Sequence, residues 1–216
     1  MKVLLIGGTG YTGKAVCDEL LQRGHQVILV TRQPQNIQAT EQLQAISLSL
    51  TDVNELAKQF AQVDVVVNTA VPDRESPDFV EKVWQMERAL VEAAKLTKVR
   101  LFLLGGAGSL YVTPTIQLVD TPEFPAEFKR EATLFKEVLA WLKQQQDVNW
   151  TMISPAPVYF NGSPFTERKG QYRVAKDEVL MLDGQPTGIS NFDLAVAIVD
   201  ELEQAKFSQQ RFTAGY

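Results

Sequence analysis

Cysteine and histidine are almost absent from this 216-residue sequence, which has one of each, Cys17 and His25. One cysteine cannot form a disulfide within the chain, and such a composition suits a reducing compartment, so we expect a cytoplasmic protein. The same scarcity excludes a zinc site built from histidine and cysteine ligands, and we expect no metal. A Ser-His-Asp triad would have to use His25, which we interpret as a turn residue between a helix and a strand.

Long apolar runs and an excess of basic residues are also missing. No stretch approaches the ~20 apolar residues that a membrane-spanning helix needs, and the apolar run near the N-terminus is too short for a signal peptide. The formal net charge is -5. It argues against nucleic acid, which requires a basic surface, and against binding to anionic lipid. We therefore expect a soluble protein with no nucleic-acid or membrane partner.

Short apolar runs alternate with helix-like segments along the chain. Runs typical of buried strands cover residues 2–7, 25–32, 43–50, 64–70, 99–106 and 148–157. Segments with apolar residues at helical spacing cover residues 11–24, 51–63, 77–97 and 126–146. This alternation predicts an α/β fold with a doubly wound, mostly parallel sheet and helices on both of its faces.

Helix details and the domain organisation can also be predicted. Thr51 or Asp52 is expected to cap the helix at residues 51–63. The apolar face expected for the helix at 126–146 consists of Phe128, Ala132, Phe135, Leu139 and Leu142.

The composition shifts after about Pro155, where glycine, proline and charged residues become frequent. We therefore predict a single domain over residues 1–216, in which residues from about 156 to 190 form a small substrate-side extension.

A glycine-rich turn, GGTGYTG at residues 7–13, follows the first predicted strand and opens the first predicted helix. It satisfies G-x-G-x-x-G from Gly8 and G-x-x-G-x-x-G from Gly7, in the strand–turn–helix context that a dinucleotide site requires. Glycines allow the backbone to approach a pyrophosphate, and the helix N-terminus offers N–H groups to it. Cofactor contacts are predicted for Gly7, Thr9, Gly10, Tyr11, Thr12 and Gly13.

The end of the second predicted strand bears on the choice of coenzyme. An NAD site usually has an acidic residue there, which accepts a hydrogen bond from the ribose 2′-hydroxyl. In this sequence the strand ends in VTRQP, so Thr31 and Arg32 occupy the position. A cation suits a 2′-phosphate, and we therefore favour NADP(H), with NAD(H) possible. The alternative is that Arg32 is only a solvated surface residue.

Several segments resemble one protein family. The stretches IGGTGYTG, VTRQP, LTDVNEL, VVVNTA, LLGGAGSL, DTPEFPAEFK and ISPAP are similar to those of the atypical short-chain dehydrogenases. More closely, the chain resembles a bacterial group named NADH-flavin reductases, which is related to NADPH-dependent biliverdin and flavin reductases and to nitrogen-regulator-like proteins. The resemblance spans essentially the whole chain, and GGAGSL followed by DTPEFP is specific to the group. It implies a Rossmann fold that binds a nicotinamide dinucleotide.

The resemblance also implies cofactor contacts beyond the glycine turn. It matches Arg32 to the residue that binds the 2′-phosphate. The third strand of such proteins often ends in G-D-L-x-D, whereas here Ser49 replaces the Asp that would approach the adenine, and Leu50 still supplies apolar contact. Residues 68–71 and 154–157 match the ends of the fourth and sixth strands, which line the dinucleotide. The contacts expected there come from Thr69, Ala70, Val71 and Pro155.

A second glycine turn, GGAGS at residues 105–109, ends the fifth predicted strand. Since the first turn already provides the phosphate site, this one is expected to serve another purpose. The active-site serine of short-chain dehydrogenases lies at the end of this strand, and ligands of open α/β sheets bind beyond the carboxyl ends of the strands. We therefore predict that Ser109 is catalytic and donates a hydrogen bond to the acceptor. The alternative is that Ser109 caps a turn.

Many enzymes of this superfamily also use a Tyr-x-x-x-Lys pair on the next helix. The corresponding segment, FPAEFKREATLFK, has no tyrosine and contains Phe128 and Lys129 instead. One such pair does occur at Tyr172 and Lys176, outside any predicted long helix, and we interpret it as a chance match. Without the tyrosine, acid–base chemistry on an alcohol or sugar is poorly supported. Hydride transfer to an electron-poor ring depends mainly on positioning and needs less from the protein.

Three functions follow from these observations. The first is an NADPH-dependent oxidoreductase that transfers hydride to a small planar acceptor such as a flavin or quinone, with flavin as a substrate rather than a tightly bound group. The second is an NADP(H)-binding redox sensor without enzymatic activity. The third is an enzyme similar to sugar epimerases or dehydratases, which the missing Tyr-Lys helix weakens.

Overall fold

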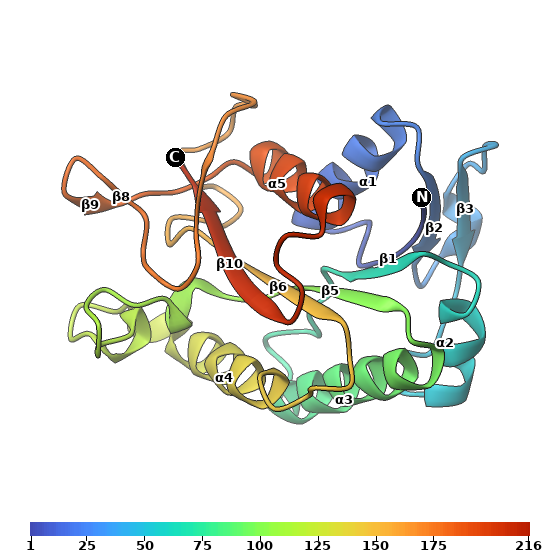
Figure 1. Cartoon of the computed structure of the whole chain (residues 1–216), viewed down its shortest axis with the longest axis horizontal. Coiled ribbons are helices and arrows are strands. Elements are labelled where there is room, and N and C mark those ends of the chain that lie inside the picture. The colour runs from blue at the N-terminus through green and yellow to red at the C-terminus, as the bar shows by residue number, and fades with distance from the viewer. The chain divides into compact units, whose positions relative to one another are not determined.

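A computed structural model describes all residues of the chain, 1–216 (Figure 1). The chain divides into two compact units. Unit 1 comprises Met1–Leu103 and Gln146–Trp150, and unit 2 comprises Leu104–Gln145 and Thr151–Tyr216. The predicted extension at about residues 156–190 lies within unit 2. The single domain over residues 1–216 stays a prediction.

The strands of unit 1 run parallel in the order β3-β2-β1-β4-β5. Their bounds are β1 (Lys2–Ile6), β2 (Gln26–Val30), β3 (Leu43–Ile46), β4 (Val65–Asn68) and β5 (Arg100–Leu104). In register, Val3 of β1 pairs with Val27 of β2 and with Val65 of β4. Every residue of β4 is buried, as expected of a strand with helices on both faces. The five strands predicted for this part of the sequence are confirmed.

Three α-helices belong to unit 1, α1 (Tyr11–Gln22), α2 (Val53–Phe60) and α3 (Phe79–Thr97), besides a short 3-10 turn at Pro34–Asn36. Figure 1 shows α1 on one side of these strands and α3 on the other. Asp52, not Thr51, caps α2, because its carboxylate accepts the Asn54 and Glu55 amides, each at 3.0 Å. Gly24, with a φ of +79°, reverses the chain after α1.

Unit 2 contains the strand order β6-β10-β7, in which β10 is parallel to β6 and antiparallel to β7. These strands are β6 (Trp150–Pro155), β7 (Arg173–Ala175) and β10 (Gln210–Gly215), and a small hairpin joins β8 (Met181–Leu182) to β9 (Gln185–Pro186). Its helices are α4 (Ala126–Leu142) and α5 (Asn191–Gln204). The strand predicted at 148–157 is thus confirmed as β6, which parallels β10.

One residue that was predicted to lie on the buried apolar face of α4 is exposed instead. Ala132, Phe135, Leu139 and Leu142 are buried, but Phe128 is 49% exposed. Phe128 lies in the first turn of α4, only two residues after the helix begins, so the helix start projects it beyond the buried stripe. No helix in the chain combines the length and apolar character required to cross a membrane.

Candidate functional site

The glycine turn between β1 and α1 is held tightly against the end of β4. Gly7 has a φ of +81°, and a Cβ placed on it would lie 2.6 Å from the Ala70 amide nitrogen. A Cβ on Gly13 would lie 2.1 Å from the Gly7 carbonyl oxygen, so both positions require glycine. α1 begins directly after Gly10, with no side-chain cap and no acidic residue in its first turn. This helix N-terminus therefore suits a pyrophosphate, with no carboxylate in the first turn to repel it.

The other residues predicted around this turn differ in exposure. Thr9 and Gly10 are exposed, Tyr11 is half-buried and Thr12 is buried. The Gly10 amide donates to the Gly7 carbonyl at 3.0 Å, which closes the turn. The backbone of the turn is therefore well defined, and cofactor contacts from these side chains stay a prediction.

The chain leaving β4 is tied both to β1 and to itself. The Thr69 amide and hydroxyl both donate to the Ile6 carbonyl, at 2.9 and 3.0 Å. The buried side chain of Asn68 accepts the Ala70 amide through Oδ1 at 3.0 Å, which bends the chain directly after the strand. Thr69, Ala70 and Val71 are all half-buried, so this bend presents them at the surface beside the glycine turn.

A buried acid that the sequence analysis did not identify lies behind this bend. Glu87 of α3 accepts a hydrogen bond from Asn68 Nδ2 through Oε1 at 3.2 Å, and its other oxygen, Oε2, is buried without a partner. Burial raises the pKa of Glu87 to about 7, although the hydrogen bond from Asn68 opposes the shift. The available signal was an acidic residue on the apolar stripe of a helix, between Met86 and Leu90.

Arg32 and Leu50 follow the ends of neighbouring strands of unit 1. Arg32 is exposed and lies two residues beyond β2, while Thr31 is half-buried and its amide donates to the Ile46 carbonyl at 3.0 Å. Leu50 is half-buried, and the preceding Ser49 amide donates to a carboxylate oxygen of α2 at 3.3 Å. Since β2 and β3 are parallel neighbours, both residues lie at the carboxyl edge of the strands of unit 1.

In unit 2, Ser109 ends a short 3-10 turn (Ala107–Ser109) and is only 3% exposed. Arg211 of β10 donates to its hydroxyl oxygen from Nη1 at 3.1 Å and to its carbonyl from Nη2 at 3.3 Å. The same Nη1 donates to the hydroxyl oxygen of Ser154 at 3.3 Å. The buried guanidinium thus holds Ser109 in place and occupies its oxygen as an acceptor, which leaves the hydroxyl proton available for donation.

Arg211 is itself balanced by an acid. Its Nε donates to Asp177 Oδ1 at 2.9 Å, and its side chain is 1% exposed against 39% for Asp177. A buried guanidinium requires such a partner, because an unpaired charge in this position would be strongly destabilising. Pro155, the last residue of β6, is buried and pairs in register with Ala214 of β10. Arg211 was not predicted from the sequence, because its contacts to Ser109 join residues 102 positions apart.

The Tyr172–Lys176 pair brackets β7 and does not lie on a helix. The Tyr172 hydroxyl donates to the carboxylate of Asp200 on α5, and Lys176 is exposed. Tyr172 therefore has a partner that ties β7 to α5.

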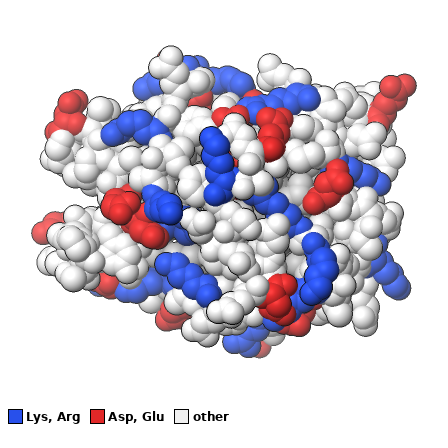
Figure 2. Space-filling view, viewed as in Figure 1, with Lys and Arg blue, Asp and Glu red and all other residues white.

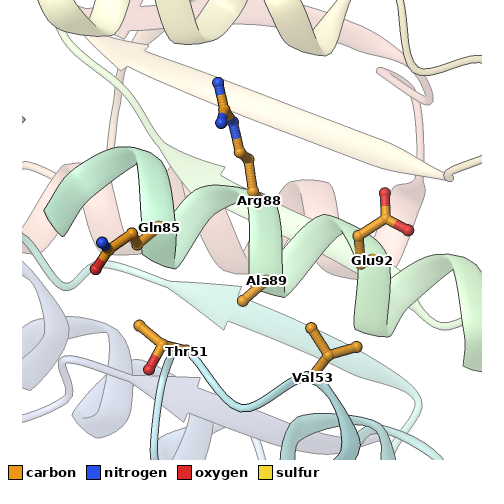
Figure 3. A pocket seen from close by; sticks show the side chains of 6 residues that line it. All are labelled: Thr51, Val53, Gln85, Arg88, Ala89 and Glu92. Atoms are coloured by element: carbon orange, nitrogen blue, oxygen red, sulfur yellow. The ribbon is translucent and has the colours of Figure 1, made fainter. Parts of the chain in front are cut away.

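A groove of about 380 Å³ runs between the loop before α2 and the α3 helix, lined by Thr51, Val53, Gln85, Arg88, Ala89 and Glu92 (Figure 3). None of the predicted cofactor residues lines it.

No cluster of three or more histidine, cysteine, aspartate or glutamate side chains could hold a metal ion. Basic and acidic side chains are interspersed on the face shown in Figure 2.

Similarity to known proteins agrees with this geometry. The sequence matches the model of a family described as NAD(P)H-binding over residues 7–205. A solved structure from Streptococcus pneumoniae, described as a candidate NADH-flavin reductase, is 28% identical with a TM-score of 0.87 and covers 100% of this chain and 99% of that one. A structure from Bacteroides thetaiotaomicron, described as a candidate epimerase, is 29% identical with a TM-score of 0.88, over 100% and 96% of the two chains.

Among enzymes with a named reaction, the chloroplastic divinyl chlorophyllide a 8-vinyl-reductase of Arabidopsis thaliana is 30% identical over 230 residues. The alignment covers 97% of this chain and 52% of the enzyme, so the chain spans about half the length of this relative. The family match, on a mostly parallel Rossmann-like α/β fold with a glycine turn after its first strand, shows that the chain belongs to the NAD(P)H-binding family and confirms its resemblance to the atypical short-chain dehydrogenases.

Proposed function

We propose that this protein is an NADPH-dependent reductase that transfers hydride from the nicotinamide to a planar, electron-poor acceptor such as a flavin or quinone. The observation that carries the proposal is the glycine turn of unit 1, where Gly7 and Gly13 let the backbone pack into a tight turn that leads into the N-terminus of α1, the arrangement typical of a pyrophosphate site. The turn, the uncapped start of α1 and the half-buried residues after β4 together offer an extended surface for a dinucleotide.

The preference for NADPH rests on Arg32. Its guanidinium is exposed just beyond β2, where an NAD-dependent protein usually has a carboxylate for the ribose 2′-hydroxyl. A guanidinium recognises phosphate oxygens through paired N–H donors, and it repels no part of the coenzyme. NADH is expected to bind through the same glycine turn but without this contact.

The choice of a planar acceptor rests on what α4 lacks. The helix that follows the Ser109 turn has Phe128 and Lys129 where related dehydrogenases use a tyrosine, and Tyr172 is bound to Asp200. Ring acceptors require positioning more than acid–base chemistry. Two of the similar proteins carry names that refer to flavin and to divinyl chlorophyllide, and both compounds contain conjugated rings.

Ser109 is the residue we assign to the acceptor. Arg211 Nη1 donates to its hydroxyl oxygen and leaves the hydroxyl proton free to be donated to a ligand, toward a carbonyl oxygen or a ring nitrogen. Flavins and quinones both present such acceptor atoms.

The proposal is tested by following NADPH absorbance with riboflavin, FMN or a benzoquinone, and by analysing a UDP-sugar incubated with the protein and coenzyme for formation of its epimer, since epimerisation consumes no coenzyme. We expect NADPH consumption with at least one ring acceptor and no conversion of the sugar. The Gly13→Ala variant should lose coenzyme binding, since its Cβ would lie 2.1 Å from the Gly7 carbonyl. Gly24→Ala also strains the backbone, at a φ of +79°, but its Cβ has no neighbour within 4 Å and it lies beyond the C-terminal end of α1, so it is the control for glycine substitution away from the turn. Coenzyme binding without turnover would favour the sensor, and sugar interconversion would favour an epimerase.

A further inference from the structure

Glu87 has features that a core residue rarely combines. It is 2% exposed in the middle of α3, it is ionisable, and one of its carboxyl oxygens is buried without a hydrogen-bond partner. The residues one turn away on the same helix, Val83, Leu90 and Val91, are fully buried and apolar. A hydrophobic residue of similar size would be compatible with this packing, so a carboxyl group calls for another explanation.

The partner of Glu87 has only one possible orientation. The Ala70 amide is a donor, so the Asn68 side chain must turn its oxygen toward it, and Nδ2 must then point toward Glu87 Oε1. Oε1 therefore acts as an acceptor. A neutral carboxyl group satisfies this geometry through its carbonyl oxygen, and the buried, unpartnered Oε2 then carries a proton rather than an uncompensated charge.

This contact leads directly to the glycine turn. Glu87 contacts Asn68, Asn68 holds the Ala70 amide, and the Ala70 nitrogen lies where a Cβ on Gly7 would be 2.6 Å away. At the last step Gly7 and Ala70 lie closer together than a residue with a Cβ at position 7 would allow, so the two segments are tightly packed. A change in the position of Asn68 is therefore transmitted to the turn that receives the pyrophosphate.

We propose that Glu87 is a positioning residue for the coenzyme: its carboxyl group holds Asn68 and the bend after β4 against the glycine turn, and it does so without a negative charge behind that turn only when protonated, so that the dinucleotide binds preferentially to the protein in which Glu87 is protonated. The inference rests on the proposed binding of a nicotinamide dinucleotide at the Gly7–Gly13 turn. Ionisation of Glu87 would place a negative charge behind a site for an anion and would draw water or a cation toward Oε2.

No nearby charge is available to neutralise an ionised Glu87. The charged residues of the adjoining elements include Glu55 and Lys58 of α2, Lys82, Arg88 and Glu92 of α3, and Arg100 of β5. Burial raises the pKa of Glu87 and the hydrogen bond from Asn68 lowers it, and no ion pair with any of these charged groups contributes to the shift. The pKa of about 7 means that the carboxyl group changes charge within the physiological range.

The experiment measures NADPH affinity calorimetrically between about pH 6 and about pH 8.5 for the wild type, Glu87→Gln and Glu81→Gln. Glu81 lies on the same helix and is exposed, so it is the matched control. We expect the wild type and the control to bind at least about fivefold more weakly at the upper pH, the lower end of typical coupling between two sites. Glu87→Gln keeps an acceptor for Asn68 and should show a clearly flatter profile. Titration of the nucleotide itself cancels in the comparison.

A second measurement needs no variant. Binding of NADH, which lacks the titrating 2′-phosphate, should take up protons near neutral pH, seen as a binding enthalpy that depends on the ionisation heat of the buffer. Identical pH profiles for wild type and Glu87→Gln, or no proton uptake, would overturn the role of Glu87 while leaving the proposed reductase intact. Failure of both NADPH and NADH to bind at any pH would overturn the proposed function as well.

Discussion

The proposed preference for NADPH depends on a single residue, Arg32. Changing Arg32→Ala removes a charge-assisted contact to the 2′-phosphate and should weaken NADPH by roughly 1.5–3 kcal/mol, which is ~10–100-fold. NADH, which has no 2′-phosphate, should be affected much less. Calorimetric titration of both coenzymes checks this, with Lys58→Ala as a control that removes an exposed cation of α2 in the same unit. Equal affinity of the wild type for NADPH and NADH would remove the argument.

A second prediction about a single residue concerns Ser109. If it donates to the acceptor, Ser109→Ala should lower kcat/KM by ~2–12-fold with little change in NADPH affinity, since one neutral hydrogen bond is worth about 0.5–1.5 kcal/mol. A much larger loss would indicate proton donation. Gln117→Ala is the matched control, because Gln117 holds the same turn by donating to the Ser109 carbonyl at 3.0 Å. If both variants only lower the melting temperature, Ser109 is a structural residue.

At the scale of secondary-structure elements, Tyr172 connects β7 to α5 through Asp200. Removing its hydroxyl in Tyr172→Phe should therefore cost about 1 kcal/mol of stability and leave turnover within a few-fold of the wild type. Urea denaturation and steady-state kinetics measure the two effects. A loss of ~10²–10⁴-fold in kcat, with the fold intact, would instead identify Tyr172 as a general acid.

Individual elements differ in how far the sequence predicted them. The strands of unit 1 were recognisable because buried parallel strands are continuous apolar runs, and α2 began at a recognisable cap. The buried face of α4 was predicted correctly except at Phe128, because helical spacing does not show where along the helix the buried face ends. β10 was not predicted from the sequence. Its place between β6 and β7 depends on pairing with residues far away along the chain, which its own sequence does not specify.

At the scale of the whole molecule, Glu87 should make stability depend on pH. Its pKa rises from an ordinary 4.5 to about 7 on folding, so the folded chain retains a proton that the unfolded chain has lost. The stability that Glu87 contributes is present below about pH 4.5 and is lost as the pH rises through about 7. Over that range the loss is of the order of 3 kcal/mol, from about 1.4 kcal/mol for each unit of pKa.

Urea denaturation of the wild type and Glu87→Gln at about pH 5 and about pH 8 measures this effect. The stability difference between them should move in favour of the glutamine variant at the higher pH, because glutamine cannot ionise. The exposed Glu81→Gln change should leave the pH dependence as in the wild type. A difference that is the same at both pH values would show that Glu87 titrates normally in the folded chain.

The sequence by itself determined the features that depend on neighbouring residues. Apolar runs and helical spacing predicted the α/β alternation, and the glycines at residues 7–13 predicted the tight turn between β1 and α1, because backbone sterics and helix ends follow from a few consecutive residues. The cofactor contacts expected at this turn stay a prediction. The family resemblance was likewise carried by short sequence segments, and it is confirmed.

Only the tertiary structure decided which distant residues meet. Arg211 reaches Ser109 across 102 positions, and Glu87 reaches Asn68 from another element. Neither contact leaves a periodic signal, because each depends on strand order and on the packing of a helix against a sheet. Burial, which raises the pKa of Glu87 and leaves its Oε2 without a partner, is likewise a property of the folded chain as a whole, since it requires every surrounding element to be in place.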